Sequence, residues 1–282
     1  MIWWVLSTFL AGFSTIFRKK SMTFETGLWK FGFMFLGRIG AILYIIYFLL
    51  WWDIWSEIVT VKNVSLVTLI CLFWTGAAVI SQYVYKVEKI SLIAPYENLN
   101  KILSIIFSFF IFSDVSFISL SIAIFVVAII FISSFDFKNK KIPKTIQIFS
   151  LNQFLLSINT ILIGYLLLQV SAVEYFVLEN IIGIFLLLLI IIFNKDIHRL
   201  RRAWKKFYFN RIGASMLGIS WYILSLYVIS TFGVTINILL SFLYLGFILI
   251  LSYFMLGDKP TFKSITVSIV VTLLVGIGFY FR

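Results

Sequence analysis

Charged residues are scarce in this chain: Asp, Glu, Lys and Arg make up 12% of its 282 residues, whereas 62% are hydrophobic and the mean hydropathy is +1.09. A water-soluble globular protein has about 25% charged and about 45–50% apolar residues. The chain therefore has too little polar surface to cover a globule in water, and we expect lipid to be its solvent. A membrane-spanning helix takes about 20 residues, so this length suits roughly ten spans without a soluble domain.

Cysteine and histidine are almost absent, with one residue of each. Cys71 alone cannot form a disulfide within the chain, and Cys71 with His198 is too small a set to bind a zinc-type metal. A membrane enzyme would otherwise need a serine with a base, or paired acids at one depth, but the intramembrane carboxylates Glu97 and Glu179 lie on opposite sides. We therefore expect no enzyme activity, no catalytic residue, no metal and no cofactor.

Ten apolar segments run along the chain, separated by short polar breaks. Most have the length of a membrane-spanning helix, and no break is long enough for a separate domain. The first segment lacks the charged start and the small-residue cleavage site of a signal peptide, so we expect it to be a membrane helix. The fold class predicted is an all-α membrane protein with ten transmembrane helices, over residues 2–17, 27–50, 65–84, 92–113, 116–135, 146–169, 173–193, 211–231, 234–256 and 261–281.

The net charge of +12 is distributed very unevenly between the two sides of such a bundle. Of the 23 Lys and Arg residues, Arg38 and Lys101 fall well inside predicted helices, Lys62 and Arg282 fall on one side, and the remaining 19 fall in the breaks or at the helix ends on the other. Cytoplasmic loops of membrane proteins collect Lys and Arg. The charge thus indicates a multi-pass protein of the cell membrane with both termini outside, rather than a nucleic-acid-binding protein.

The two halves of the chain match each other when they are aligned so that Asp114 lies on Asp258. We call this offset along the sequence the repeat shift. It aligns Phe112-Ser113-Asp114 with Leu256-Gly257-Asp258, and a last apolar helix follows each. Because each half has five helices, an odd number, the second half enters the membrane upside down. We expect two inverted repeats, residues 1–137 and 145–282, joined by a cytoplasmic linker over residues 138–144.

Polar residues form a stripe on one face of the fourth and of the ninth predicted helix. The spacing within each stripe is close to multiples of one helical turn, so the polar side chains face away from lipid, toward other helices or a cavity. The repeat shift aligns several members of the two stripes. They comprise Glu97, Asn100, Lys101, Ser104 and Ser108 in the first half, and Asn237, Ser241, Tyr244 and Ser252 in the second.

Three parts of the chain resemble the drug/metabolite transporter superfamily, in its EamA-like branch of ten helices. They are residues 11–19 with Gly37-Arg38-Ile39-Gly40, the stretch Ile90-Ser91-Leu92-Ile93-Ala94-Pro95 leading to Asp114, and its counterpart from Thr235 to Leu256-Gly257-Asp258-Lys259-Pro260-Thr261. The resemblance implies a secondary-active or facilitative transporter of a small metabolite, such as an amino acid, another polar metabolite or a drug-like amphiphile. It also implies alternating access to a central site. The family commonly has Glu in place of these two Asp residues, and its termini are cytoplasmic.

Arg38 lies near the middle of the second predicted helix, where an arginine costs about 2.5–3.5 kcal/mol to insert. Something must compensate that cost, either an anionic group of a substrate or an ion pair that locks helices together. Glu179 and Asn180 approach the same depth from the other half and could complete a polar site with Arg38. They could equally be solvated at the membrane interface.

Glu97 and Lys101 are one helical turn apart, so they either line a cavity or form a salt bridge within their helix. Aromatic residues of the third and eighth helices could stack on a substrate or simply pack. The complete set of candidate substrate-binding residues is Arg38, Trp74, Tyr83, Glu97, Asn100, Lys101, Ser104, Gln153, Glu179, Asn180, Tyr227, Asn237, Ser241 and Tyr244.

Two other functions remain open at this point. A flippase for a lipid or a lipid-linked carrier, built on the same fold, would use the aromatic bulk to hold a long tail. A structural or assembly protein of the membrane would not need two matched polar faces. The expected partners are a small-molecule substrate and membrane lipids, and the protein is a monomer or a homodimer whose helices meet at Ser268, Thr272 and Gly276, which are spaced for close packing.

Overall fold

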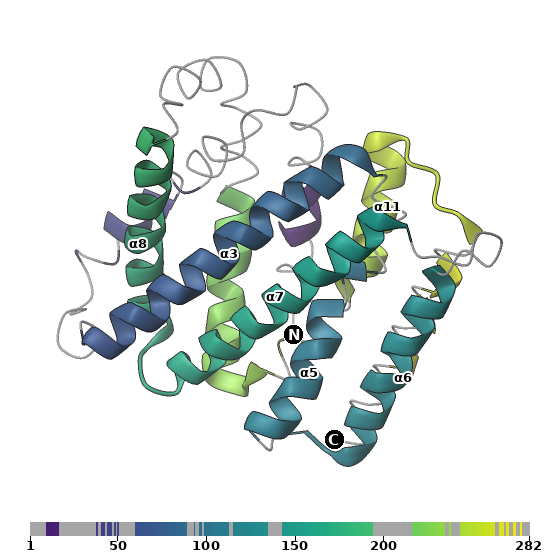
Figure 1. Cartoon of the computed structure of the whole chain (residues 1–282), viewed down its shortest axis with the longest axis horizontal. Coiled ribbons are helices and arrows are strands. Elements are labelled where there is room, and N and C mark those ends of the chain that lie inside the picture. The colour runs from purple at the N-terminus through teal and green to yellow at the C-terminus, as the bar shows by residue number, and fades with distance from the viewer. Residues whose placement is uncertain are drawn as a thin grey trace.

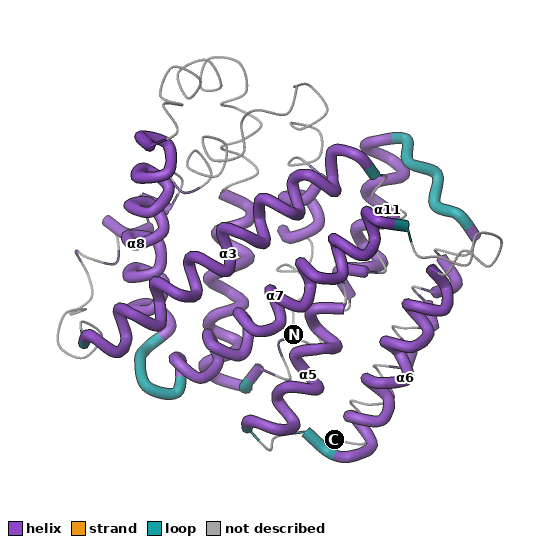
Figure 2. Tube along the Cα trace, viewed as in Figure 1, coloured by secondary structure: helices purple, strands orange, loops and turns teal. Residues whose placement is uncertain are grey.

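The computed structural model describes residues 10–16, 38, 41–42, 44–46, 48, 50, 60–88, 93, 96–97, 99–112, 115–134, 143–193, 216–234, 237, 243–262, 265–267, 269–270, 273–274 and 277. Within these ranges nearly the whole backbone is helical, and no described residue belongs to a strand (Figure 2). The prediction of an all-α protein is confirmed for this part of the chain. The proposed dimer residues Ser268, Thr272 and Gly276 lie outside the described residues.

Three of the helices are long and apolar enough to cross a membrane: Val61–Tyr85, Lys144–Leu167 and Ala172–Phe193. This identifies the chain as a membrane protein, and it agrees with three of the ten predicted spans. The labelled helices are α3 (Val61–Val87), α5 (Leu99–Ile111), α6 (Phe117–Ser134), α7 (Lys144–Leu167), α8 (Ala172–Phe193) and α11 (Leu243–Leu256) (Figure 1). A further apolar helix covers Met216–Phe232.

Local hydrogen bonds define several of the helix ends. Thr60 begins α3, because its side chain accepts a hydrogen bond from the backbone N–H of Asn63 at 3.2 Å. At the start of α8, the Ser171 hydroxyl accepts from the N–H of Glu174, and the Glu174 carboxylate accepts from the N–H of Ser171, which is a capping box. Gly257 follows the last residue of α11 with a φ of +70°, a conformation that a side chain disfavours.

Helix α7 lies between α3 and α5 and packs against both, while α5 also packs against α6 and α3 against α8 (Figure 1). One apolar core fills the space among α5, α6, α7 and the end of α3, with Phe149 and Ile102 fully buried. A second core lies among the middle of α3, α8 and the helix over residues 216–232. The helices around these two cores hold the buried polar groups described below.

Residues 10–16 and 41–48, near the start of the chain, pack against helices from its last part. Residues 10–16 pack against α11, where a Cβ added to Gly12 would lie 3.0 Å from Leu251. They also approach the helix over residues 216–232, since a Cβ on Gly218 would lie 2.9 Å from the Ser14 hydroxyl. Residues 41–48 contact that helix as well, with a hydrogen bond of 3.1 Å between Tyr44 and Ser220.

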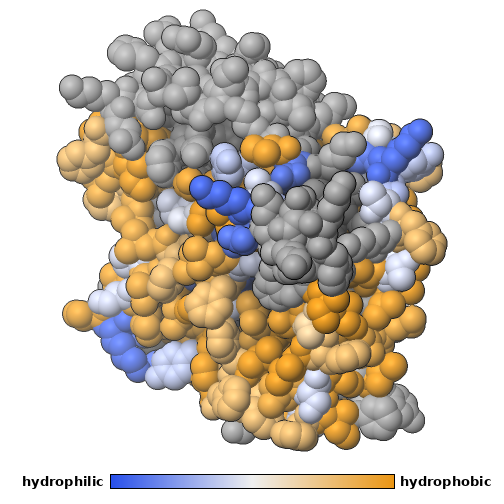
Figure 3. All heavy atoms as spheres, turned by 45° about the vertical axis from the view of Figure 1, so that its right-hand side comes forward, coloured by the Kyte–Doolittle hydropathy of each residue, from blue (hydrophilic) through white to orange (hydrophobic). Residues whose placement is uncertain are grey.

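On the face drawn in Figure 3, most of the described residues are apolar. Aromatic side chains stand out from several helices, among them Phe117, Phe193 and Phe254, which are 73%, 81% and 77% exposed. A surface of this kind would aggregate in water, whereas in a bilayer it faces lipid tails at no cost. The arrangement therefore agrees with lipid as the solvent of these helices.

Gly164 lies in a close helix contact, and of the described glycines it leaves the least room for an added Cβ. A Cβ built on it would lie 2.4 Å from Cγ2 of Val234, a buried and stiff β-branched side chain. We expect Gly164→Ala to lower the free energy of unfolding by about 1–2 kcal/mol, since overpacking outweighs the gain in helix propensity. Thermal unfolding in detergent measures this.

Two further variants show whether the steric contact is the cause. Gly76→Ala on α3 has nothing within 4 Å of the added Cβ, so it should be neutral or slightly stabilising. Adding Val234→Ala to Gly164→Ala should restore most of the loss. If the double variant melts as low as Gly164→Ala alone, contact with Val234 is not the reason.

Candidate functional site

The most buried charges of the described chain gather around Arg38. Trp74 is the middle residue of α3, and Glu179 and Asn180 lie in the first half of α8. Since α3 has 27 residues, it is about 40 Å long against a hydrocarbon core of about 30 Å, so its middle residue is near the membrane centre. We call Arg38, Cys71, Trp74, Glu179 and Asn180 the arginine cluster.

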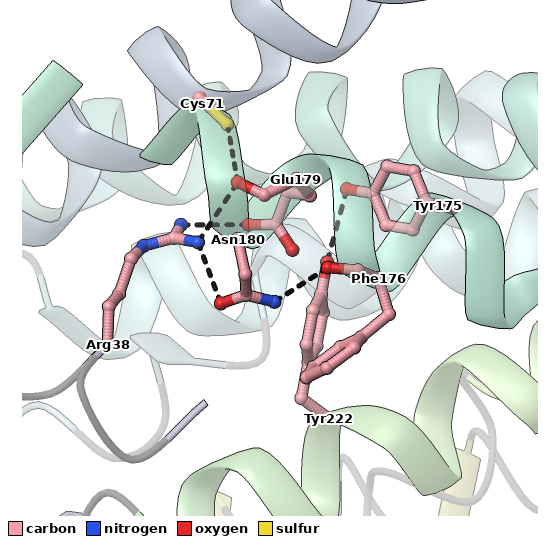
Figure 4. Close-up of polar contacts among 7 residues, drawn as sticks. All are labelled: Arg38, Cys71, Tyr175, Phe176, Glu179, Asn180 and Tyr222. Carbon is pink, nitrogen blue, oxygen red and sulfur yellow. Dashed lines mark hydrogen bonds and ion pairs between the residues drawn. The ribbon is translucent and has the colours of Figure 1, made fainter. Parts of the chain in front are cut away.

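Arg38 is bound to α8 by three hydrogen bonds (Figure 4). Its Nη2 donates to Oε1 of Glu179 at 2.8 Å, which is also an ion pair. Its Nη1 donates to Oδ1 of Asn180 at 3.0 Å and to the backbone carbonyl of Glu179 at 3.3 Å. Arg38 and Glu179 are only 6% and 3% exposed, so the pair is buried, hydrogen-bonded and neutral overall.

The guanidinium group of Arg38 is also held by packing on two sides. It lies over the Trp74 ring, with Cζ 4.6 Å from the ring centroid, which is a cation–π contact. On α8, a Cβ added to Gly183 would lie 2.5 Å from Cζ and 2.6 Å from Nη1 of Arg38. Only a glycine at this position lets the guanidinium approach the α8 backbone so closely.

Neighbouring side chains orient the partners of Arg38. The Nδ2 of Asn180 donates to the Phe176 carbonyl at 2.8 Å, which turns its Oδ1 toward Arg38. The Cys71 thiol donates to the Glu179 carbonyl at 3.4 Å. Nearer the start of α8, the Tyr222 hydroxyl donates to that of Tyr175 at 3.1 Å (Figure 4).

Two buried atoms of the cluster, Nε of Arg38 and Oε2 of Glu179, have no hydrogen-bond partner among the described residues.

A second polar group lies where the end of α3 meets the residues before α5. The Tyr85 hydroxyl donates a hydrogen bond to the Glu97 carboxylate, and the Tyr85 ring packs edge-on against Phe149 of α7. Glu97 is 8% exposed, and its charge acts on the half-buried ammonium of Lys101. Tyr85 lies three helical turns beyond Trp74 on α3, so this group is about 16 Å from the arginine cluster along the helix.

Helices α5 and α7 meet in a contact that we call the α5–α7 seam, where the rings of Phe107 and Phe154 pack 5.9 Å apart. By helix geometry, Asn100 and Ser104 of α5 and Ser150 of α7 lie on the same faces as these two rings. Ser104 donates to the carbonyl of Asn100 within its own helix at 2.7 Å. Asn152 and Asn159 lie on another face of α7, toward α3, where Asn152 donates to the Ser81 hydroxyl at 2.8 Å.

The predicted site residues are thus distributed over two places. Arg38, Trp74, Glu179 and Asn180 meet in the arginine cluster, whereas Glu97, Asn100, Lys101 and Ser104 belong to the second group and the seam. Gln153 is buried on α7 and Asn237 is half-buried. Ser241 and the side chain of Tyr244 lie outside the described residues.

Tyr83 and Tyr227 are not brought to either place. They are 44% and 60% exposed, on the outer faces of their helices. Tyr83 is two residues from both Ser81 and Tyr85, which is about 200° around the helix, so it points away from the side that packs on α7. The repeat shift pairs the two tyrosines, but it does not say which way they face.

The sequence pattern does not reveal several residues of the arginine cluster and of the polar groups around Glu97 and α7. Cys71, Gly183 and Tyr85 act through contacts with distant parts of the chain, which have no local signal. Asn152 and Asn159 are seven residues apart, two helical turns, so their common face was detectable from the sequence.

Compared with the models of known protein families and with curated proteins, the sequence has no significant match. The chemistry of the residues themselves must therefore indicate the function. Among the described residues, no three His, Cys, Asp or Glu side chains are grouped to bind a metal ion. Arg38 stays protonated in any protein environment, so the arginine cluster can bind and orient charged groups but cannot transfer a proton through Arg38.

Proposed function

We propose that the protein is a membrane transporter of a small polar metabolite, of the drug/metabolite type, with ten transmembrane helices in two inverted repeats. It moves its solute by alternating access, either facilitated or driven by a gradient. The arginine cluster is the centre of the site, at the contact between the two repeats. The single observation behind this proposal is the buried pairing of Arg38 from the first half with Glu179 and Asn180 from the second.

A transporter whose two repeats tilt against each other needs polar groups of this kind at the contact between the repeats. Two charged groups near the membrane centre are costly unless they pair, and they usually belong to a pathway for ions or substrates. Among the described residues, Nε of Arg38 has no hydrogen-bond partner, which leaves one donor for a solute. Because the cluster is neutral overall, a solute without net charge can bind there with no buried charge left uncompensated.

The pattern of helix contacts supports two inverted repeats. The repeat shift aligns helix α5 (Leu99–Ile111) with helix α11 (Leu243–Leu256). Helix α5 packs on α7, and correspondingly α11 packs on residues 10–16. Helix α3 also packs on α7, and correspondingly residues 216–232 pack on residues 10–16. The contact of α3 with α8 has its counterpart in residues 216–232 with residues 41–48.

Transport of solute by the purified protein tests the proposal. Thermal-shift measurements against metabolites, lipids and drug-like amphiphiles identify ligands, and proteoliposomes then measure their flux. We expect an amino acid or other small polar metabolite to raise the melting temperature and to cross protein-containing vesicles at least tenfold faster than empty ones. Stabilisation by tail-bearing lipids alone, with lipid movement between leaflets, would identify a flippase. No flux of any stabilising ligand would contradict the proposal.

The predicted orientation can be tested separately. A cysteine placed at Lys138 or Arg201 in a Cys71→Ser protein should react with an impermeant maleimide only in inside-out vesicles, because 19 of the 23 Lys and Arg residues fall on that side. Reaction in right-side-out vesicles would place the termini in the cytoplasm.

A further inference from the structure

Two buried asparagines of α7 face α3. Asn152 and Asn159 are seven residues apart, which is two helical turns, so they lie on the same side of α7. Asn152 donates its Nδ2 to the Ser81 hydroxyl at 2.8 Å, and this bond turns that side toward α3. The two asparagines are 0% and 4% exposed, yet Oδ1 of each has no hydrogen-bond partner among the described residues. Buried polar atoms normally find partners, and lipid provides none.

The depth of Asn159 follows from the way α3 and α7 run side by side (Figure 1). The two helices are antiparallel, because the first turn of α3 is hydrogen-bonded to a residue just beyond the end of α7, whereas Ser81 near the end of α3 meets Asn152. Seven residues from Ser81 toward the start of α3 is Trp74, and seven from Asn152 toward the end of α7 is Asn159. Both steps are about 10.5 Å along the helix axes, so Asn159 is level with Trp74 and with the arginine cluster.

The same side of α7 also reaches the apolar core beside the arginine cluster. Ile163 and Leu166 lie four and seven residues beyond Asn159, within about 40° of it around the helix. Both are buried in the core that contains Cys71, a member of the cluster, and Tyr175 of α8. Asn159 therefore adds a buried amide from α7 at the depth of the arginine cluster and on the side that faces it.

We propose that Asn159 is a further solute-binding residue, whose Oδ1 accepts a hydrogen bond from an N–H or O–H group of the solute. The arginine cluster offers a donor, Nε of Arg38, and Asn159 offers an acceptor without charge. Because the cluster is neutral overall, the class of solute that fits is one without net charge that carries both an acceptor group for Arg38 and a donor group for Asn159. The assignment rests on the proposed function and names the chemistry of its substrate.

Leucine variants of the two asparagines test the assignment, because leucine has nearly the shape of asparagine but no polar atom. Asn159→Leu should melt in detergent at or above the wild-type temperature, since it removes a buried acceptor that has no partner in the described structure. Asn152→Leu is the matched control on the same side of the same helix. It should melt at a lower temperature, because it loses the hydrogen bond to Ser81.

Solute binding is measured by thermal shift on the same three proteins. The probes are L-serine, L-glutamine and uridine, which are neutral overall and carry both acceptor and donor groups. We expect at least one of them to bind the wild type, to bind Asn152→Leu with an affinity within twofold of it, and to bind Asn159→Leu at least tenfold more weakly. Weaker binding without a lower melting temperature is a result that a purely structural role of Asn159 would not give.

Three results would overturn the proposal. A lower melting temperature of Asn159→Leu without solute would show that the protein itself satisfies this amide. Unchanged affinity in Asn159→Leu, or no binding of any probe by the wild type, would exclude the residue or the class of solute. Flux in proteoliposomes separates this inference from the proposed function. Binding that depends on Asn159 in a protein that moves no solute would keep the site and remove the transporter, whereas normal flux in Asn159→Leu would keep the transporter and remove Asn159 from its site.

Discussion

Replacing Glu179 with Gln should destabilise the protein far more than replacing Arg38 with Ala. Glutamine leaves the positive charge of Arg38 buried beside α8 without a counter-charge, since arginine cannot lose its proton in a protein. Removing one partner of a buried pair costs about 3–5 kcal/mol. Arg38→Ala leaves a carboxylate instead, and a carboxyl group can become neutral by taking up a proton. We expect Arg38→Ala to lose about 1–3 kcal/mol less stability than Glu179→Gln.

The double variant Arg38→Ala/Glu179→Gln separates stability from transport. It leaves no buried charge, so thermal unfolding in detergent should show it recovering most of the stability that Glu179→Gln loses. Flux in proteoliposomes should remain at least tenfold below wild type in all three variants, because each lacks part of the central site. A double variant that is stable and transports normally would show that the pair only locks helices together.

The same experiment decides between the two interpretations of Arg38 that the sequence left open. The structure provides the ion pair and also the cation–π contact with Trp74, so the charge is already compensated within the protein. Compensation alone explains how Arg38 is tolerated. It does not explain why Nε of Arg38 has no hydrogen-bond partner within the described part of the chain, and a binding role would explain that.

The sequence predicted contacts best where a buried charge is costly and few residues can compensate it. An arginine in the middle of an apolar helix must find an acceptor, and Glu179 and Asn180 were the acidic and amide groups available at that depth in the other half. The structure pairs these residues. The choice of α3 as the third helix of the cluster, through Trp74 and Cys71, depends on how the helices pack, and the sequence has no local sign of that.

Helix faces were harder to predict than helix positions. The stripe on the fourth helix was recognised, because Glu97, Lys101 and Ser104 repeat at the helical period. The sequence could not show that this stripe meets α7 rather than the arginine cluster. For the same reason, two clusters about 16 Å apart along α3 were expected to form one site. Periodicity determines which residues share a face, whereas the neighbour of that face is decided by tertiary packing.

Replacing Glu97 with Gln should nearly abolish transport at little cost in stability. The substitution keeps an acceptor for the Tyr85 hydroxyl but removes the negative charge that acts on Lys101 at one end of the α5–α7 seam. Lys101 is partly buried, and its long side chain can extend toward water, so we expect a loss of about 1–2 kcal/mol in the free energy of unfolding. Alternating access requires both the closed and the open seam. A positive charge that has lost the opposing charge of Glu97 disfavours the closed seam, and about 1.4 kcal/mol shifts the equilibrium between the closed and the open seam tenfold.

Flux in proteoliposomes, with thermal unfolding of the same samples, measures this effect, and Glu174→Gln is the matched control. Glu174 belongs to the capping box at the start of α8, where glutamine can also accept the hydrogen bond, so the substitution loses only the favourable effect of a negative charge at the helix start, about 0.3–1 kcal/mol, and it lies away from the seam. We expect flux to fall at least tenfold in Glu97→Gln and to stay within twofold of wild type in Glu174→Gln. Normal flux in Glu97→Gln would exclude the polar face of α5 from the transport route, whereas equal losses in both variants would mean that flux follows stability and not the charge at the seam.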